Sequence, residues 1–183
     1  MAKFFLYIVL IVSTSVPYRA VAQSRIKWIT WEEAIERSKK EKRKIFIDIY
    51  TDWCGWCKKL DKTTFAQEDI ADYINANYYP IKFDAEMERS VVLKEKEYKF
   101  VKSGRNGYHE LAAQLLQGRM SYPSMVFLDE EFNMIQAIPG YQDAGIFELI
   151  ISYFGSNSHR TVPWNKFQAS FRKEDYFFRE GKK

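Results

Sequence analysis

Both cysteines of the 183-residue chain, Cys54 and Cys57, stand three positions apart, shortly after an apolar run at residues 45–50. That run is typical of a buried strand, so the cysteines are expected where the strand leads into a helix. The first turn of a helix carries unsatisfied N–H groups and a partial positive charge, which stabilise a thiolate and lower its pKa. We therefore predict that Cys54 is a nucleophile and that Cys57, about one turn further on, is the resolving thiol.

Three other uses of the cysteine pair compete with a redox role. A structural disulfide that closes so short a loop would contribute only about 2 kcal/mol, against about 4.7 kcal/mol for a loop of about 100 residues. A zinc site needs four ligands, and beyond the cysteines the chain offers only His109 and His159, at spacings unlike those of zinc fingers. Covalent haem attachment needs a histidine after the second cysteine, where Lys58 stands. A redox pair is the favoured interpretation.

Asp48 interrupts the apolar run, six positions before Cys54. A carboxylate inside such a strand costs several kcal/mol unless it is paired or protonated. Desolvation raises the pKa of a buried carboxyl group, which suits Asp48 to accept the proton of Cys57 when that thiol attacks a mixed disulfide. The alternative is a structural role, in which the Asp48 side chain caps the nearby turn.

Two tryptophans, Trp53 and Trp56, flank the cysteines. They are either packing residues or an apolar rim for a polypeptide substrate, because aromatic anchors are typical of binding sites. His109 lies in a stretch at 108–117 whose periodicity favours a packed helix over a second catalytic element.

Around these residues the sequence predicts alternating strands and helices. A capping box at Thr30 and Glu33 opens the first helix, and hydrophobic periodicity and turn residues bound the others. The expected strands are 26–29, 45–50, 79–83, 124–128 and 134–138, and the expected helices are 31–42, 54–65, 68–76, 108–117 and 144–154. The charged stretch 84–107 is predicted to be an insertion, partly helical at about 91–100. This order implies an α/β fold with one mixed sheet and helices on both faces.

Residues 1–22 have the three regions of a secretory signal peptide: a basic start, an apolar core at 4–12 and small residues that end at Ala22. An uncleaved membrane anchor is the alternative, but the apolar core is short for a bilayer, and Pro17 and Arg19 prevent its extension towards Ala22. We expect cleavage after Ala22, a periplasmic or secreted protein, and no stable membrane insertion after cleavage.

Charge and length limit the remaining partners. Without the leader the chain carries 26 basic and 24 acidic residues, nearly balanced and interleaved in sign, so no nucleic-acid partner is expected. Residues 23–155 can form one domain, and the tail at 156–183 has aromatic residues at helical spacing, Trp164, Phe167 and Phe171. We expect the tail to wrap back on the domain; docking to a partner or a membrane surface is the alternative.

Residues 26–154 resemble a thioredoxin-fold domain, and four local features carry the resemblance. They are Trp53-Cys54-Gly55-Trp56-Cys57-Lys58, similar to the thioredoxin active-site sequence with tryptophan in place of its proline; Asp48, at the place of a buried aspartate; Tyr122-Pro123, at the place of a cis-proline opposite the disulfide; and Pro139-Gly140-Tyr141, at the end of a hairpin. The chain is most similar in these features to secreted bacterial thioredoxin-like proteins.

The resemblance implies a thiol-disulfide oxidoreductase that reduces disulfides of exported proteins. The implied catalytic residues are Cys54, Cys57 and Asp48, and the implied substrate-binding residues are Trp53, Trp56, Tyr122 and Pro123. No cofactor or metal is expected, and a separate thiol-disulfide partner must supply the electrons. Two alternatives stay open: a non-catalytic module that binds polypeptides, and a disulfide oxidant.

Overall fold

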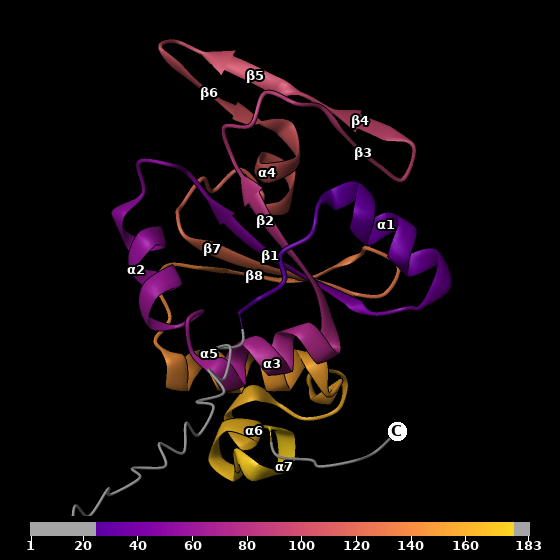
Figure 1. The fold of residues 1–183 in the computed structure, drawn as a ribbon, viewed down its shortest axis with the longest axis vertical. Coiled ribbons are helices and arrows are strands. Elements are labelled where there is room, and N and C mark those ends of the chain that lie inside the picture. Colours follow the sequence, from indigo (N-terminus) through magenta and orange to yellow (C-terminus); the bar gives the residue numbers. More distant parts are fainter. Residues whose placement is uncertain (1–24, 178–183) are drawn as a thin grey trace, which may run out of the picture.

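A four-stranded sheet runs through the centre of residues 25–177, the part of the chain that the computed structural model describes (Figure 1). The strand order is β2-β1-β7-β8, in which β1 and β2 are parallel and the other neighbours are antiparallel. The strands are β1 (Lys44–Tyr50), β2 (Tyr78–Asp84), β7 (Ser124–Leu128) and β8 (Met134–Pro139). The predicted mixed sheet is confirmed, whereas the predicted leader at 1–22 lies outside the described residues.

Helices cover both faces of this sheet, because successive residues of β1 point to opposite sides. Ile45, Ile47 and Ile49 belong to a core shared with α1 and α4, and Phe46 belongs to a second core shared with α2, α3 and α5. The helices are α1 (Trp31–Lys40), α2 (Gly55–Thr63), α3 (Glu68–Asn77), α4 (Glu110–Leu115) and α5 (Ala144–Gly155). The two cores hold β1 in place, and the end of β1 positions the cysteines.

The edge strand predicted at 26–29 is wrong. Within the described chain this segment makes only an isolated bridge, between Ile29 and Ile81 of β2. The backbone of this segment is hydrogen-bonded to a side chain instead: Asn75 Oδ1, in α3, accepts a hydrogen bond from the Lys27 N–H at 2.8 Å. The Asn75 side chain thus binds a backbone N–H that the apolar pattern predicted would pair with a neighbouring strand.

The helix boundaries follow the predictions with small shifts. Thr30 caps α1 as expected, with its Oγ1 accepting a hydrogen bond from the Glu33 N–H at 3.1 Å, and the helix ends at Lys40, two residues early. α4 is shorter than predicted because residues 108–109 belong to a strand. The helix also ends before the glycine that was expected to stop it: Gln117, with φ 52°, is the left-handed residue that follows the C-cap Leu116, and the Gly118 N–H donates back to the Ala113 carbonyl at 2.8 Å.

The insertion at 84–107 was predicted to be partly helical, and this is wrong: it forms two β-hairpins. β3 (Val91–Leu93) pairs with β4 (Lys96–Tyr98), and β5 (Phe100–Ser103) pairs with β6 (Asn106–His109). Both hairpins project beyond α4 at the top of Figure 1. The first turns through Lys94 and Glu95, with φ of 50° and 65°. Val91 and Leu93 are buried against the α1 core, a burial period of two that fits a strand.

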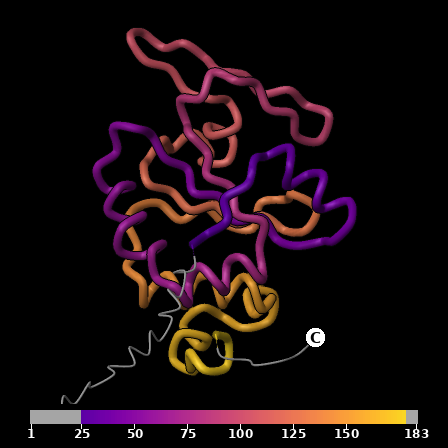
Figure 2. Tube along the Cα trace, in the orientation of Figure 1, coloured from indigo at the N-terminus to yellow at the C-terminus, as the bar shows by residue number. Residues whose placement is uncertain are grey.

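Residues 156–177 of the tail pack against α3 and α5, as the trace in Figure 2 shows. They form the 3-10 helix η1 (Ser158–Arg160), α6 (Trp164–Ser170) and α7 (Glu174–Phe177). The ring of Phe167 lies 4.9 Å from that of Tyr153, and the ring of Phe177 lies 4.8 Å from that of Tyr73. The described part of the tail therefore wraps back on the domain, as expected. None of the helices between residues 25 and 177 has the length and apolar character needed to cross a membrane.

Candidate active site

Cys54 and Cys57 form a disulfide where β1 leads into α2. Cys54 is the N-cap of α2, and its Sγ accepts a hydrogen bond from the Cys57 N–H at 3.0 Å. A thiolate at Cys54 would lie against the positive end of the helix, the setting that lowers a thiol pKa. In this disulfide form both residues are nearly buried, 5% and 3% exposed, so they differ little in accessibility.

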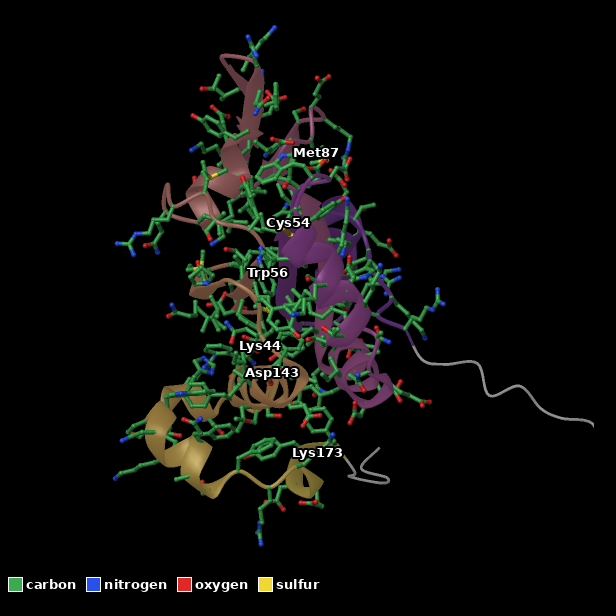
Figure 3. All side chains as sticks on the ribbon, turned by 90° about the vertical axis from the view of Figure 1, so that its left-hand side faces the viewer. Lys44, Cys54, Trp56, Met87, Asp143 and Lys173 are labelled. Atoms are coloured by element: carbon green, nitrogen blue, oxygen red, sulfur yellow. A yellow bond between two sulfur atoms is a disulfide. The ribbon has the colours of Figure 1, made fainter. Side chains whose placement is uncertain are left out.

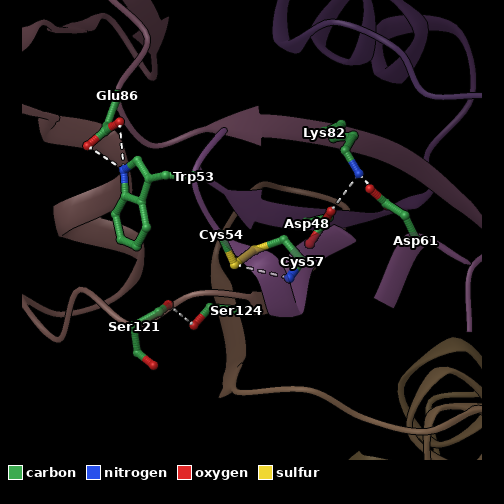
Figure 4. The surroundings of a disulfide bond; sticks show 9 residues. All are labelled: Asp48, Trp53, Cys54, Cys57, Asp61, Lys82, Glu86, Ser121 and Ser124. Carbon is green, nitrogen blue, oxygen red and sulfur yellow. Dashed lines mark hydrogen bonds and ion pairs between the residues drawn. A yellow bond between two sulfur atoms is a disulfide. The ribbon is translucent and has the colours of Figure 1, made fainter. Parts of the chain in front are cut away.

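Asp48 lies in β1 and is only 1% exposed, which confirms its predicted burial. It pairs in register with Lys82 of β2, and its Oδ2 accepts a hydrogen bond from Lys82 Nζ at 3.1 Å. Burial raises the pKa of Asp48 to about 6, against the opposing effect of the Lys82 ammonium. Within residues 25–177 its Oδ1 has no hydrogen-bond partner. Figure 4 shows Asp48 between Lys82 and Cys57; its catalytic role stays a prediction.

Lys82 and Asp61 complete a charged cluster that sequence reasoning missed. Lys82 Nζ forms ion pairs with both Asp48 and Asp61, which lies in α2. The rings of Trp28 and Tyr50 lie 5.2 and 5.1 Å from the same ammonium. Burial alone would lower the pKa of Lys82, but the two carboxylates together raise it. A signal for Lys82 was available, because it interrupts an apolar strand as Asp48 does.

Trp53 is 65% exposed beside the disulfide. Its Nε1–H donates to both carboxylate oxygens of Glu86, each at 3.1 Å, and its ring meets the ring of Tyr122 edge to face at 5.8 Å. Burial raises the pKa of Tyr122 to about 12, and the carboxylates of Glu86 and Asp84 add to the effect. Sequence reasoning missed Glu86, because only the path of the chain after β2 brings it to Trp53.

Trp56 is 56% exposed and has its own supports. Its ring lies 5.6 Å from that of Tyr141, and the Lys59 ammonium lies 4.6 Å from the Trp56 ring and 5.0 Å from the Tyr141 ring. Figure 3 looks onto this side of the molecule and shows Cys54 and Trp56 between the hairpins and α5. Both tryptophans predicted to line the site are therefore exposed next to the disulfide, each held by separate neighbours.

The loop before β7 contains the predicted proline. The Tyr122–Pro123 peptide bond is cis, as the resemblance implied. The Pro123 carbonyl accepts a hydrogen bond from the Gly140 N–H at 2.8 Å, and the Ser121 carbonyl accepts one from Ser124 Oγ at 2.7 Å. Gly140 has φ +87°, a conformation that favours glycine. The cis-proline loop and the end of β8 are thus joined by a backbone hydrogen bond at the site.

His109, considered above as a zinc ligand, has both ring nitrogens engaged by backbone. Nδ1 accepts a hydrogen bond from the Leu111 N–H at 3.1 Å and caps α4, and Nε2 lies 3.1 Å from the Arg89 carbonyl. Burial lowers the pKa of this histidine. His109 therefore ties the start of the hairpin region to α4.

Comparison with known proteins gives one family. The family model Thioredox_DsbH, described as "Protein of unknown function, DUF255", matches residues 9–142. The disulfide bond reductase DsbH of Chlamydia pneumoniae is 23% identical over 128 residues, which cover 69% of this chain and 70% of that protein. Animal relatives, including spermatogenesis-associated protein 20 of Rattus norvegicus, are 27–30% identical over 66–88 residues. This chain spans only 8–12% of the length of those relatives.

Solved structures share the fold. A structure of a DsbH oxidoreductase matches with a TM-score of 0.54 and 18% identity, over 76% of this chain and 90% of its own. A thioredoxin from Thermus thermophilus matches with a TM-score of 0.51 and 12% identity, over 75% of this chain and 98% of its own. These matches show that the chain has a thioredoxin fold, as the sequence resemblance implied.

Proposed function

Because this chain belongs to the Thioredox_DsbH family, we propose that it is a thiol-disulfide oxidoreductase that reduces disulfides of exported proteins. One observation carries the proposal: the Cys54–Cys57 disulfide caps a helix, and Asp48 is buried in the strand that leads to it. This arrangement supplies a stabilised thiolate and a base within one short segment. The name of the Chlamydia relative, a disulfide bond reductase, supports the reducing direction.

The reaction begins with the reduced protein. The Cys54 thiolate attacks one sulfur of a substrate disulfide, forms a mixed disulfide and releases the other substrate sulfur as a thiolate, which takes a proton from water. The attacking sulfur is Cys54 rather than Cys57 because it caps α2 and accepts the Cys57 N–H at 3.0 Å. No electrons leave the pair of proteins at this stage, since one disulfide has replaced another.

The second step releases the substrate. Asp48 accepts the proton of the Cys57 thiol, and the resulting thiolate attacks the Cys54 sulfur of the mixed disulfide. The substrate leaves with two thiols, and the protein is left with the Cys54–Cys57 disulfide seen here. With a pKa of about 6, Asp48 is mostly ionised at pH 7 and remains a stronger base than an ordinary carboxylate.

The exposed aromatic surface beside the disulfide receives the substrate. Trp53 and Trp56 offer apolar surface next to a nearly buried disulfide, and Tyr122 and Pro123 lie in the adjacent loop before β7. An extended polypeptide can place its disulfide over Cys54 while its side chains contact the tryptophans. The alternative of a pure binding module uses the same surface but needs no cysteine.

The electrons for the next cycle come from a separate thiol-disulfide partner. The chain has only two cysteines, and both are consumed in the disulfide that ends the reaction. A dithiol on another protein must therefore exchange with Cys54 and reduce the pair. The chemistry needs no further cofactor, because thiol-disulfide exchange moves both electrons between sulfur atoms.

Two measurements test the proposal. Insulin disulfide reduction should require Cys54, so a Cys54→Ser variant should lose turnover; retained peptide binding with no turnover in the natural chain would instead favour the binding module. Equilibration with glutathione should give a potential nearer about −270 mV than about −120 mV, because Trp56 adds no charge near the thiolate. A value near about −120 mV would identify a disulfide oxidant.

Export is the remaining part of the proposal. The apolar core and small residues within 1–22 support a leader that is removed after Ala22. The mature protein should then begin at Gln23 and appear in the periplasm or the medium. Amino-terminal sequencing of the protein from each cell fraction tests this directly, and a chain that keeps Met1 in the membrane fraction would show an anchor instead.

A further inference from the structure

The Lys82 ammonium is shared between two carboxylates from different elements. Asp48 reaches it from β1 and Asp61 reaches it from α2, while Lys82 itself comes from β2. The three differ in exposure: the side chains of Asp48, Lys82 and Asp61 are 1%, 24% and 41% exposed. The Lys82 ammonium therefore forms ion pairs with a buried carboxylate, Asp48, and with a partly solvated one, Asp61.

The surroundings leave the ammonium little freedom. The rings of Trp28 and Tyr50 lie 5.2 and 5.1 Å from Lys82 Nζ, and that of Phe65 lies 5.9 Å away. An ammonium is attracted to the faces of aromatic rings at such distances. The rings and the two carboxylates together hold Lys82 where it is, so its position depends on partners from several elements and not on Asp48 alone.

We propose that Asp61 is a positioning residue, which keeps Asp48 able to take up a proton by drawing the Lys82 ammonium partly away from it. The inference deepens the proposed function, because Asp48 is there the base for Cys57. Asp61 acts through Lys82 and touches neither sulfur nor substrate in this role. The arrangement has a net charge of −1 when all three groups are ionised, whereas Asp48 and Lys82 alone would be neutral.

Two effects of Asp61 act in the same direction. Its negative charge repels the charge on ionised Asp48, and its ion pair with Lys82 weakens the stabilisation that Lys82 gives to Asp48. Lys82 and Asp61 are the charged groups that act on Asp48 within the described chain, and the Tyr50 phenol also faces Lys82. Cys57 lies next to Asp48 in Figure 4 and titrates only in the reduced protein, so the oxidised protein isolates the effect of Asp61. Asp61 thus helps burial to keep the pKa of Asp48 raised.

The ion pair between Asp69 and Lys173 serves as a comparison, because it is similarly exposed and lies away from the disulfide. Asp69 pairs with Lys173, and their side chains are 30% and 32% exposed. That pair joins α3 to the tail, away from the disulfide. Partly exposed pairs of this kind contribute little to stability. If Asp61 were an ordinary surface partner of Lys82, its loss would resemble the loss of Asp69.

The test is a titration of the Asp48 carboxyl carbon by ¹³C NMR, in the oxidised and the reduced protein. Asp61→Asn should lower the pKa of Asp48 by about one unit, the low end of the range for a neighbouring charge, because Asp61 is 41% exposed. Asp61→Glu should restore the natural value, and Asp69→Asn should leave it unchanged. No shift in Asp61→Asn, or an upward shift, would overturn the proposal, the latter by showing that Asp61 holds Lys82 close to Asp48.

A kinetic readout joins this inference to the reaction. In single turnovers that start from a mixed disulfide on Cys54, the rate of resolution is measured against pH. In Asp61→Asn the acidic limb of this profile should shift to lower pH by the same amount as the pKa of Asp48. The two proposals fail separately. A shifted titration in a protein without reductase activity would remove the proposed function and keep the role of Asp61. Full activity with an unshifted titration and pH profile would remove the role of Asp61 alone.

Discussion

The disulfide lies between two regions with opposite properties, which we call the floor (Asp48, Lys82 and Asp61) and the rim (Trp53, Trp56 and Tyr122). The floor holds charges: Asp48 is 1% exposed and pairs with Lys82 at 3.1 Å. The rim holds aromatic rings, and its two tryptophans are 65% and 56% exposed. The floor buries one carboxyl group, Asp48, and the rim exposes apolar surface, the reverse of the usual distribution in a folded domain.

This difference assigns separate tasks to the two regions. Electrostatic interactions are strong where water is excluded, so changes in the floor should alter proton transfer and stability. Charges at the rim are screened by solvent, and its aromatic surface can be buried only by a partner. Floor variants should therefore change pH profiles, and rim variants should change the affinity for substrates.

The largest effect is expected from Asp48→Asn. Asparagine cannot accept the Cys57 proton, so resolution of the mixed disulfide should slow by about 10²–10⁴-fold, the usual contribution of a general base. The initial attack by Cys54 should change much less. Stopped-flow measurement of both steps checks this, with Asp69→Asn as the control for loss of a remote carboxylate. Equal rates of resolution in both variants would make Asp48 structural only.

Asp48→Asn should also stabilise the oxidised protein at pH 7. The folded-state pKa of Asp48 is raised from 3.8 to about 6, so the folded protein binds this proton more tightly than the unfolded chain does. The resulting stability is fully present below pH 3.8 and is lost as pH rises through about 6. At pH 7 the loss is about 3 kcal/mol, which asparagine avoids. Lys82 keeps Asp61 as a partner in the variant.

Denaturant unfolding at pH 4 and pH 7 measures this second effect. The natural protein should lose stability between the two values through Asp48, and Asp48→Asn should lose less. A matched Asp61→Asn variant should gain far less at pH 7, because the Asp61 side chain is 41% exposed and costs little to keep charged. A variant Asp48→Asn that is less stable at pH 7 would mean that its ion pair with Lys82 outweighs its desolvation.

Floor and rim also differed in how well the sequence predicted them. Trp53 and Trp56 were found from their place beside the cysteines, and Asp48 was found because it breaks an apolar strand. Lys82 could have been found by the same rule. Asp61 could not, because its contact with Lys82 depends on the packing of α2 against the sheet, which no local pattern encodes.

The main error in the fold has a local cause. The first hairpin turns at Lys94 and Glu95, both with positive φ, although such turns usually contain asparagine or glycine. No turn residue marked the position, and the alternating lysines and glutamates of 94–97 are good helix formers. The central sheet was predicted well because its strands are apolar and bounded by clear turn residues.

A smaller effect is expected from Trp53→Ala at the rim. Removal of this exposed ring should raise KM for a disulfide-containing peptide about tenfold, since aromatic anchors in interfaces often contribute more than 1 kcal/mol. The pH profile of resolution should stay unchanged, because Trp53 makes no contact with Asp48 or Lys82 in the described structure. Glu86→Gln keeps an acceptor for the indole N–H and should cost less than Trp53→Ala. A shifted pH profile in Trp53→Ala would show that floor and rim are coupled.

The smallest effect is expected from Lys59→Gln, which removes the one cation that contacts a rim tryptophan within residues 25–177. The Lys59 ammonium lies 4.6 Å from the Trp56 ring and 5.0 Å from the Tyr141 ring, and at an exposed site such a contact contributes about 0.5–1 kcal/mol. KM should rise by no more than about two- to fivefold, the equivalent of that contribution, and salt should reduce the difference. Lys62→Gln is the matched control, because Lys62 lies on the same helix and has no ring contact in the described part of the chain. An effect of Lys59→Gln as large as that of Trp53→Ala would mean that charge, and not apolar area, directs recognition at the rim, and the contrast between the two regions would no longer hold.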